Sequence, residues 1–110
     1  MSKQSVLVQD TAADADAFSG TDLEFAPGPG ILQVWVASTV NTATVTAVLG
    51  GANIVRGQVI ALRTNGIPNI NEDPPVVSEA CVGGEKNVIN IGGTTGTVHS
   101  RAVFTPLEDL

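Results

Sequence analysis

The chain has 110 residues, the length of one domain, and 15% of them are charged while 43% are apolar. The net charge is −6 and the five basic residues are dispersed along the sequence, so neither nucleic acid nor an anionic membrane surface is expected as a partner. A single cysteine excludes an intrachain disulfide, and neither a secretory signal nor a membrane-spanning run is found, so we expect a protein that is made in a cytoplasm and assembles there.

The first 20 residues predict an extended polar arm ahead of a domain of residues 21–110. Ser5–Gln9 has β character, but polar residues flank it and no tight turn joins it to a following strand. It is either an attachment arm that adds a strand to a partner's sheet edge, or the first strand of its own domain, and the sequence leaves both open. The partner-binding candidates of this segment are Val6, Leu7 and Val8. Val6 and Val8 would point into the partner while Leu7 points away, or the reverse if the register shifts by one residue.

Runs of β-branched residues, separated by turns rich in Gly and Pro, predict about eight strands along the chain. We expect these strands at Ser5–Gln9, Leu23–Ala26, Ile31–Ser38, Thr42–Leu49, Gln58–Arg63, Val76–Val82, Asn87–Ile91 and Thr97–Thr105. Residues 64–75 predict a long loop, and residues 92–96 a hairpin-like turn. Two-residue alternation with such regular turns is typical of an all-β sandwich, and eight strands favour a jelly roll.

Ile31–Ser38 has the strongest strand pattern, and it is apolar on both faces. Leu32, Val34 and Val36 share one face, and Trp35 lies on the other. A small two-layer sandwich normally leaves one face of each sheet wet, so we expect another subunit to cover the second face. The partner-binding candidates on that face are Ile31, Gln33 and Trp35, and Ala37 shares it.

The inward positions of the predicted strands give a candidate core. Alternation assigns the same face to every second residue of a strand, so the apolar row should be the buried one. The residues expected in the core are Val34, Val36, Val45, Ala47, Ile60, Leu62, Ile89, Ile91, Ala102 and Phe104.

Catalytic chemistry has few candidate residues in this chain. Nucleophilic catalysis needs a nucleophile, a base and a group that orients the base, and the chain has one thiol, Cys81, and one imidazole, His99. The sequence does not say whether the two meet in space. We expect Cys81 to be a small buried apolar residue and His99 to be half-exposed on a strand. Two such ligands do not complete a zinc site, so we expect no enzyme activity, cofactor or metal.

Acidic residues offer one alternative to that expectation. Asp10, Asp14, Asp16 and Asp22 lie within thirteen residues and could supply oxygen ligands to calcium. Their spacing does not match an EF-hand, so an acidic face toward solvent or a basic partner is favoured. The carboxylate pairs at 72–73 and 108–109 lack the aromatic residues of a sugar cleft, and the Gly-rich turns match no phosphate-binding loop.

Three stretches of the chain resemble the small bacteriophage capsid decoration, or cement, proteins. The stretches are DLEFAPGPGILQVWVAST, which leads into the first core strand, then TATVTAVLGG, and finally GGTTGTVHSRAVFTPLEDL at the C-terminal end. The resemblance covers residues 20–106. It implies a jelly-roll or sandwich subunit, often a trimer, that binds the outside of an icosahedral shell made of major capsid protein and stabilises it. It carries over no catalytic residues.

The sequence therefore predicts a structural virion protein on the capsid surface, assembled in the host cytoplasm as a homo-oligomer, with a trimer expected from the resemblance. The alternative is a carbohydrate- or receptor-binding sandwich of a phage fibre or adhesin, in which Trp35 would stack on a sugar. Such a module normally exposes a cluster of aromatic residues, and this chain has three Phe, one Trp and no Tyr.

Overall fold

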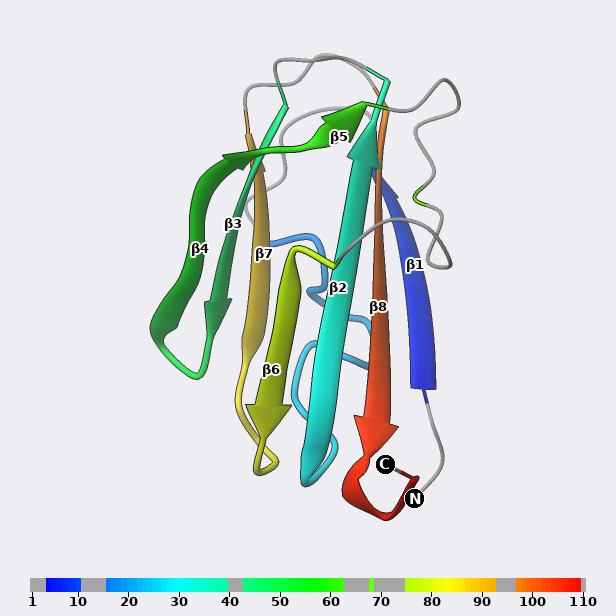
Figure 1. The fold of residues 1–110 in the computed structure, drawn as a ribbon, viewed down its shortest axis with the longest axis vertical. Helices are drawn as coiled ribbons and strands as arrows, with labels where there is room; N and C mark the ends of the chain where they lie inside the picture. Colours follow the sequence, from blue (N-terminus) through cyan, green and yellow to red (C-terminus); the bar gives the residue numbers. More distant parts are fainter. Residues whose placement is uncertain are drawn as a thin grey trace.

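The computed structural model describes residues 4–10, 16–39, 43–62, 68, 75–92 and 97–109, which form a β-sandwich of two sheets packed face to face (Figure 1). The first sheet contains β1 (Gln4–Asp10), β2 (Gly30–Ser38), β5 (Ala61–Leu62), β6 (Val77–Cys81) and β8 (Val98–Pro106). The second sheet contains β3 (Thr44–Leu49), β4 (Ala52–Val59) and β7 (Asn87–Gly92). A 3-10 turn, η1 (Leu107–Asp109), follows β8. The predicted all-β sandwich is confirmed.

The five-stranded sheet runs in the order β1-β8-β2, and β6 and β5 share the far edge of β2. All of its pairings are antiparallel except the short β2–β5 contact. The three-stranded sheet runs β4-β3-β7, and residues 16–26 lie along the other edge of β7. There the Ala17 N–H donates to the Ile89 carbonyl (2.8 Å) and the Asn87 N–H donates to the Glu24 carbonyl (2.7 Å). This segment thus extends the second layer without forming a regular strand.

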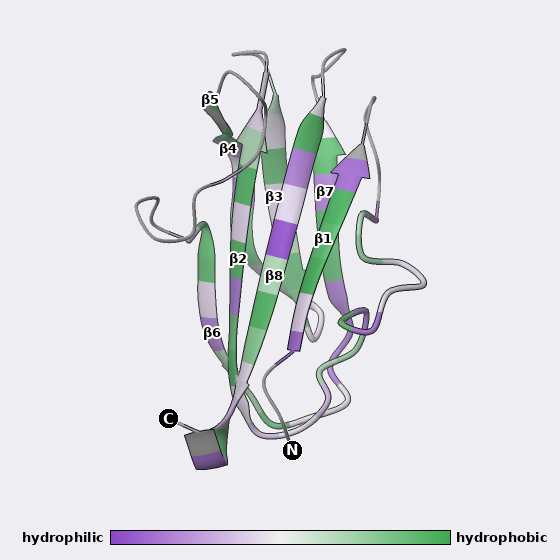
Figure 2. Cartoon of the chain, turned by 90° about the vertical axis from the view of Figure 1, so that its right-hand side faces the viewer, coloured by the Kyte–Doolittle hydropathy of each residue, from purple (hydrophilic) through white to green (hydrophobic). Residues whose placement is uncertain are grey.

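The core lies between the two sheets and is made of the inward row of each strand. On β2 that row is Leu32, Val34 and Val36, as the alternation predicts, and Phe104 of β8 is fully buried beside it. Figure 2 shows the apolar and polar bands alternating along β8, which stands beside β1 at one margin of the sandwich. Nine of the ten predicted core residues are buried; the prediction is wrong for Leu62, which is 55% exposed at the end of β5.

The boundaries of the predicted elements need four corrections. The predicted strand Gln58–Arg63 is not a single strand, because β4 ends at Val59 and β5 covers Ala61–Leu62. Residues 4–10 are not a free arm, because β1 pairs with β8 of the same chain through seven residue pairs. Phe18 is fully buried in the core, so the described residues before position 21 belong to the sandwich. Leu23–Ala26 is not a strand and contributes only the isolated bridge from Phe25 to Lys86. The predicted loop at 64–75 and turn at 92–96 lie largely outside the described residues.

Candidate partner-binding surfaces

The outer face of β2 is closed within the single chain along much of its length. Trp35 is 7% exposed and Ala37 is fully buried, and His99 and Val103 of β8 are buried on the same face. The sequence predicts a second subunit over Trp35, but this side chain needs none to leave water. Of the three candidates on this face, Ile31 and Gln33 are half-buried and Trp35 is inaccessible to a partner in this conformation.

The candidates of the N-terminal segment lie on two faces of β1. Val6 and Val8 point inward and pack against the core cluster, because they stand opposite Ala102 and Ser100 on β8. Leu7 points outward, opposite Arg101, and is 46% exposed. Of the three residues assigned to partner binding, only Leu7 therefore presents its side chain on the surface of the sandwich.

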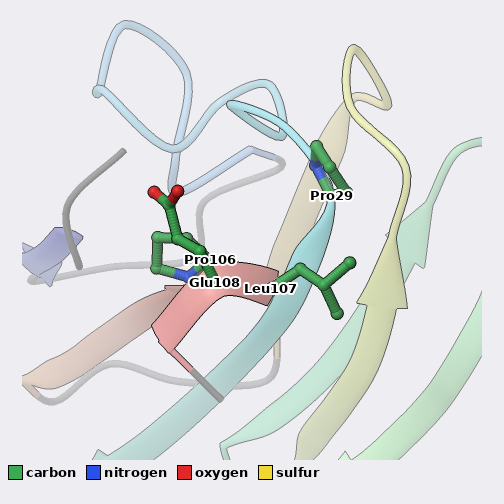
Figure 3. Close-up of a pocket in the computed structure, with 4 residues that line it drawn as sticks. All are labelled: Pro29, Pro106, Leu107 and Glu108. Atoms are coloured by element: carbon green, nitrogen blue, oxygen red, sulfur yellow. The ribbon is translucent and has the colours of Figure 1, made fainter.

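Exposed apolar residues that the sequence did not predict lie on the segments at the end of the sandwich where β2 begins and β6 and β8 end (Figure 1). We call this set the apolar end, and it consists of Phe25, Pro29, Val82 and Leu107. Phe25 is 52% exposed, Val82 is 81% exposed and Leu107 is 62% exposed. These residues come from three segments far apart in the sequence, so no local sequence pattern predicts that they lie at the same end of the sandwich. Pro29 and Leu107, together with Pro106 and Glu108, line a hollow beside η1 (Figure 3).

Backbone hydrogen bonds hold the three segments of the apolar end together. The Leu107 N–H donates to the Pro29 carbonyl at 3.0 Å. The Ala26 N–H donates to the Glu85 carbonyl and the Gly84 N–H to the Ala26 carbonyl, both at 2.8 Å. The apolar side chains thus stand on fixed backbone, and a partner would lose little conformational entropy of the chain on binding them.

The turn that carries Val82 is fixed by one carboxylate. Glu85 accepts hydrogen bonds from the Val82 N–H at 3.0 Å and the Gly83 N–H at 2.6 Å, and these bonds, the one from Val82 first, lower the pKa of Glu85 below its usual value. Gly83 has a φ of +115°, and a Cβ there would meet the Cα of Gly28 at 3.1 Å. Glycine therefore suits this position, where the turn approaches the adjoining segment closely.

Cys81 and His99 do not form a catalytic pair. Cys81 stands opposite Gly30 and His99 opposite Ala37, so they lie seven residues apart along β2, or about 23 Å at 3.3 Å per residue. They also lie on opposite faces, since Cys81 packs in the core and His99 on the outer face. Cys81 is the small buried residue that was expected, whereas His99 is buried at 8% exposure rather than half-exposed.

The Cys81 thiol is expected to react slowly in the native protein. Burial, and next the nearby charge of Glu85, raise its pKa above the ordinary 9.0, so little nucleophilic thiolate forms near neutral pH. Because the folded state disfavours ionisation of the Cys81 thiol, the thiol's contribution to the free energy of unfolding is fully present below pH 9.0. That contribution is lost as the pH rises through the pKa that the thiol has in the folded protein. Reaction with a disulfide reagent at pH 8 should be about tenfold slower or more in buffer than in denaturing urea. Equal rates would contradict the burial of Cys81.

The acidic residues do not gather into a metal site within the described part of the chain. Lys86 contacts both Asp16 and Glu24, each at 3.7 Å, and Asp22 is exposed. No cluster of three or more potential metal ligands is found among the residues that the structure describes. The other residues of the calcium alternative, and the carboxylates at 72–73, lie outside the described side chains.

Comparisons with protein-family models, with curated proteins and with solved structures found no match to this chain. None of the described residues forms a helix long and apolar enough to cross a membrane. We therefore infer the function from the fold and from the exposed surfaces.

Proposed function

We propose that the chain is a jelly roll that works as a structural virion subunit, decorating and stabilising an icosahedral phage capsid by binding its outer surface as an oligomer. The observation that carries this proposal is the apolar end, a set of exposed apolar side chains on hydrogen-bonded segments at one end of a small all-β scaffold. A large apolar group exposed on a small domain favours a protein partner over solvent.

The path of the chain supports the jelly roll. One sheet has the order β1-β8-β2-β6, and in the other residues 16–26 occupy the place of a fourth strand beside β7. If residues 16–26 are counted with the second layer, the chain changes layer at each connection from β1 to β8 except within the β3–β4 hairpin and the junction of β5 with β6. Two layers of four strands, with the first and last strands as neighbours, are typical of the jelly rolls found in viral capsids and lectins.

The described side chains favour a structural role over catalysis or glycan recognition. The one thiol and the one imidazole are far apart, so neither can activate the other. Trp35, the residue that would stack on a sugar, is 7% exposed. The exposed aromatic residue is Phe25 at the apolar end, and it is not part of an aromatic cluster on the surface, because Phe18, Trp35 and Phe104 are buried.

Add-back to particles tests this proposal. Capsid-sized particles purified from the organism or virus that produces this protein should carry the chain at a fixed ratio to their major protein. Gradient sedimentation and mass spectrometry measure this ratio. After the chain is stripped off, wild-type protein should rebind and co-sediment. Val82→Asp should bind at least about tenfold more weakly, because it introduces a charge into the apolar contact.

Val59→Asp is the matched control. Val59 is 63% exposed at the opposite end of the sandwich, where β4 ends, so the same substitution there should leave rebinding unchanged. Both valines are exposed, and neither change should unfold the protein. A chain that stays at the top of the gradient, or equal loss with both variants, would contradict attachment through the apolar end. Binding in a glycan screen without binding to particles would favour the fibre or adhesin alternative.

A further inference from the structure

Three of the four outer strand edges in the described structure are blocked or interrupted. The edge of β7 is bonded by residues 16–26. β4 has two register shifts against β3, and Gly57 bends it with a φ of +58°. β6 has five residues and shares its side of β2 with β5. Natural sheets use such short, bulged or covered edges to prevent pairing with other chains.

The remaining edge, that of β1, is long and regular. Its seven residues, QSVLVQD, pair consecutively with β8 without a register shift, and they include no Pro, Lys or Arg. In Figure 1 β1 stands at the margin of its sheet, and no described residue donates or accepts a backbone hydrogen bond on its outer side. Such an edge is a template for another strand.

We propose that β1 binds β1 of a second copy of this chain, antiparallel and centred on Leu7, so that one continuous sheet runs through two sandwiches. Leu7 then faces Leu7 of the second copy across a two-fold axis. In this register Val6 faces Val8, Ser5 faces Gln9 and Gln4 faces Asp10. In this register odd-numbered residues lie opposite odd-numbered residues, and even-numbered residues lie opposite even-numbered ones. In each strand one of these two sets directs its N–H and C=O groups to β8 and the other directs them outward. The outward-directed groups of the two copies therefore lie opposite each other and can form hydrogen bonds.

The side chains of β1 favour a second copy over an unrelated strand. Asp10 is its one charged residue, and in this register its position lies opposite Gln4 rather than opposite a second acidic residue. Leu7, 46% exposed in the single chain, gains an apolar neighbour of its own kind on the outer face. Val6 and Val8, half-buried at the margin of the core, gain cover on the inner face. β1 is therefore complementary to itself.

This inference rests on the proposed function in one respect, that the chain acts as an oligomer. It replaces the trimer that the resemblance implies with a two-fold contact, because the outer face of β2, on which an additional subunit was expected, is already closed at Trp35. Two copies that each carry a net charge of −6 repel one another, so the dimer should tighten as salt screens the charge.

Engineered cysteines test the register directly, in a Cys81→Ala background that removes the native thiol. Leu7→Cys should form a disulfide-linked dimer under mild oxidation, since opposite Cα atoms in an antiparallel pair lie about 4.5–5.5 Å apart. Ser5→Cys is the matched control on the same face. Its counterpart lies four residues away along the partner strand, about 13 Å, which is beyond disulfide reach. Absence of the Leu7→Cys dimer, or equal crosslinking of both variants, would overturn the proposal.

Sedimentation equilibrium and hydrogen exchange test the contact without crosslinking. The wild-type protein should be a dimer at micromolar concentration, and Leu7→Lys should raise the dissociation constant about tenfold or more, because it places two like charges opposite each other. Leu62→Lys, at an exposed leucine of β5, should leave it unchanged. In the wild type, amide protection of residues 4–10 should rise with protein concentration.

A monomer, a trimer or concentration-independent protection of β1 would each overturn the pairing, even if Leu7→Lys fails to fold. The particle test keeps the two proposals apart. If dimerisation fails while Val82→Asp still abolishes particle binding, only the β1 contact is wrong. If the dimer forms but wild-type protein does not bind particles, the capsid role is wrong and the β1 contact stands.

Discussion

Phe104→Ala is expected to lower the free energy of unfolding by about 3–5 kcal/mol, as truncation of a buried phenylalanine does. Phe104 is fully buried on the inward face of β8, opposite Leu32 of β2 on one side and Gln4 of β1 on the other. It thus joins three strands of the five-stranded sheet to the core. The substitution removes the buried ring and leaves a cavity that two paired strands prevent from collapsing.

Phe25→Ala provides the matched control. The chemical change is identical, but Phe25 is 52% exposed at the apolar end and its loss should cost less than about 1 kcal/mol. Urea unfolding of both variants measures the difference between their free energies of unfolding, provided that these free energies fall with urea concentration at equal slopes. A loss below about 1 kcal/mol for Phe104→Ala would show that the ring does not lie in the core.

The two-residue period is sufficient to predict much of the fold. On β2 the row of Leu32, Val34 and Val36 is the buried one, since a strand that packs on one face must repeat its apolar residues at every second position. The same reasoning identifies Val45 and Ala47 on β3. Glycine pairs and Pro-Gly runs mark where these strands end, because they interrupt the ladder.

The pattern fails where the ladder is irregular. Ala52–Val59 forms β4, but Gly57 and two register shifts break its alternation, so no strand was predicted for its first six residues. Leu62 follows the apolar pattern yet lies in a two-residue strand at the margin, with 55% of its surface exposed. Periodicity assigns a residue to a face of a strand, and only the tertiary arrangement decides whether that face is covered.

The candidate surfaces were harder to predict than the core, for the same reason. Alternation shows that Trp35 faces away from Leu32, but not that the same chain buries it. The apolar end brings together Phe25, Val82 and Leu107, which no local window contains. The sequence leaves open whether Ser5–Gln9 is an attachment arm or the first strand of its own domain, and the structure shows the strand, since β1 pairs with β8.

Gly30→Ala is expected to destabilise the protein by about 1–3 kcal/mol, through crowding rather than through a cavity. Gly30 is buried at the start of β2, between Pro106 of β8 and Cys81 of β6. A Cβ there would collide with the carbonyl oxygen of Thr105 and would lie 2.8 Å from the Cζ of Phe104. The carbonyl belongs to the β2–β8 ladder, so it can move only if the two strands separate.

The strain from Gly30→Ala should also reach the apolar end, because Pro29 directly precedes Gly30 and its carbonyl accepts the Leu107 N–H. The variant should therefore lose particle binding together with stability, whereas Val82→Asp loses binding alone. Gly92→Ala is the control for the loss of a strand glycine, since the nearest atom to its added Cβ is the Thr44 Oγ1 at 3.4 Å, an ordinary contact. Thermal unfolding of the two variants gives the comparison. If Gly30→Ala were as stable as Gly92→Ala, the close approach of β2 to β8 at this position would be wrong.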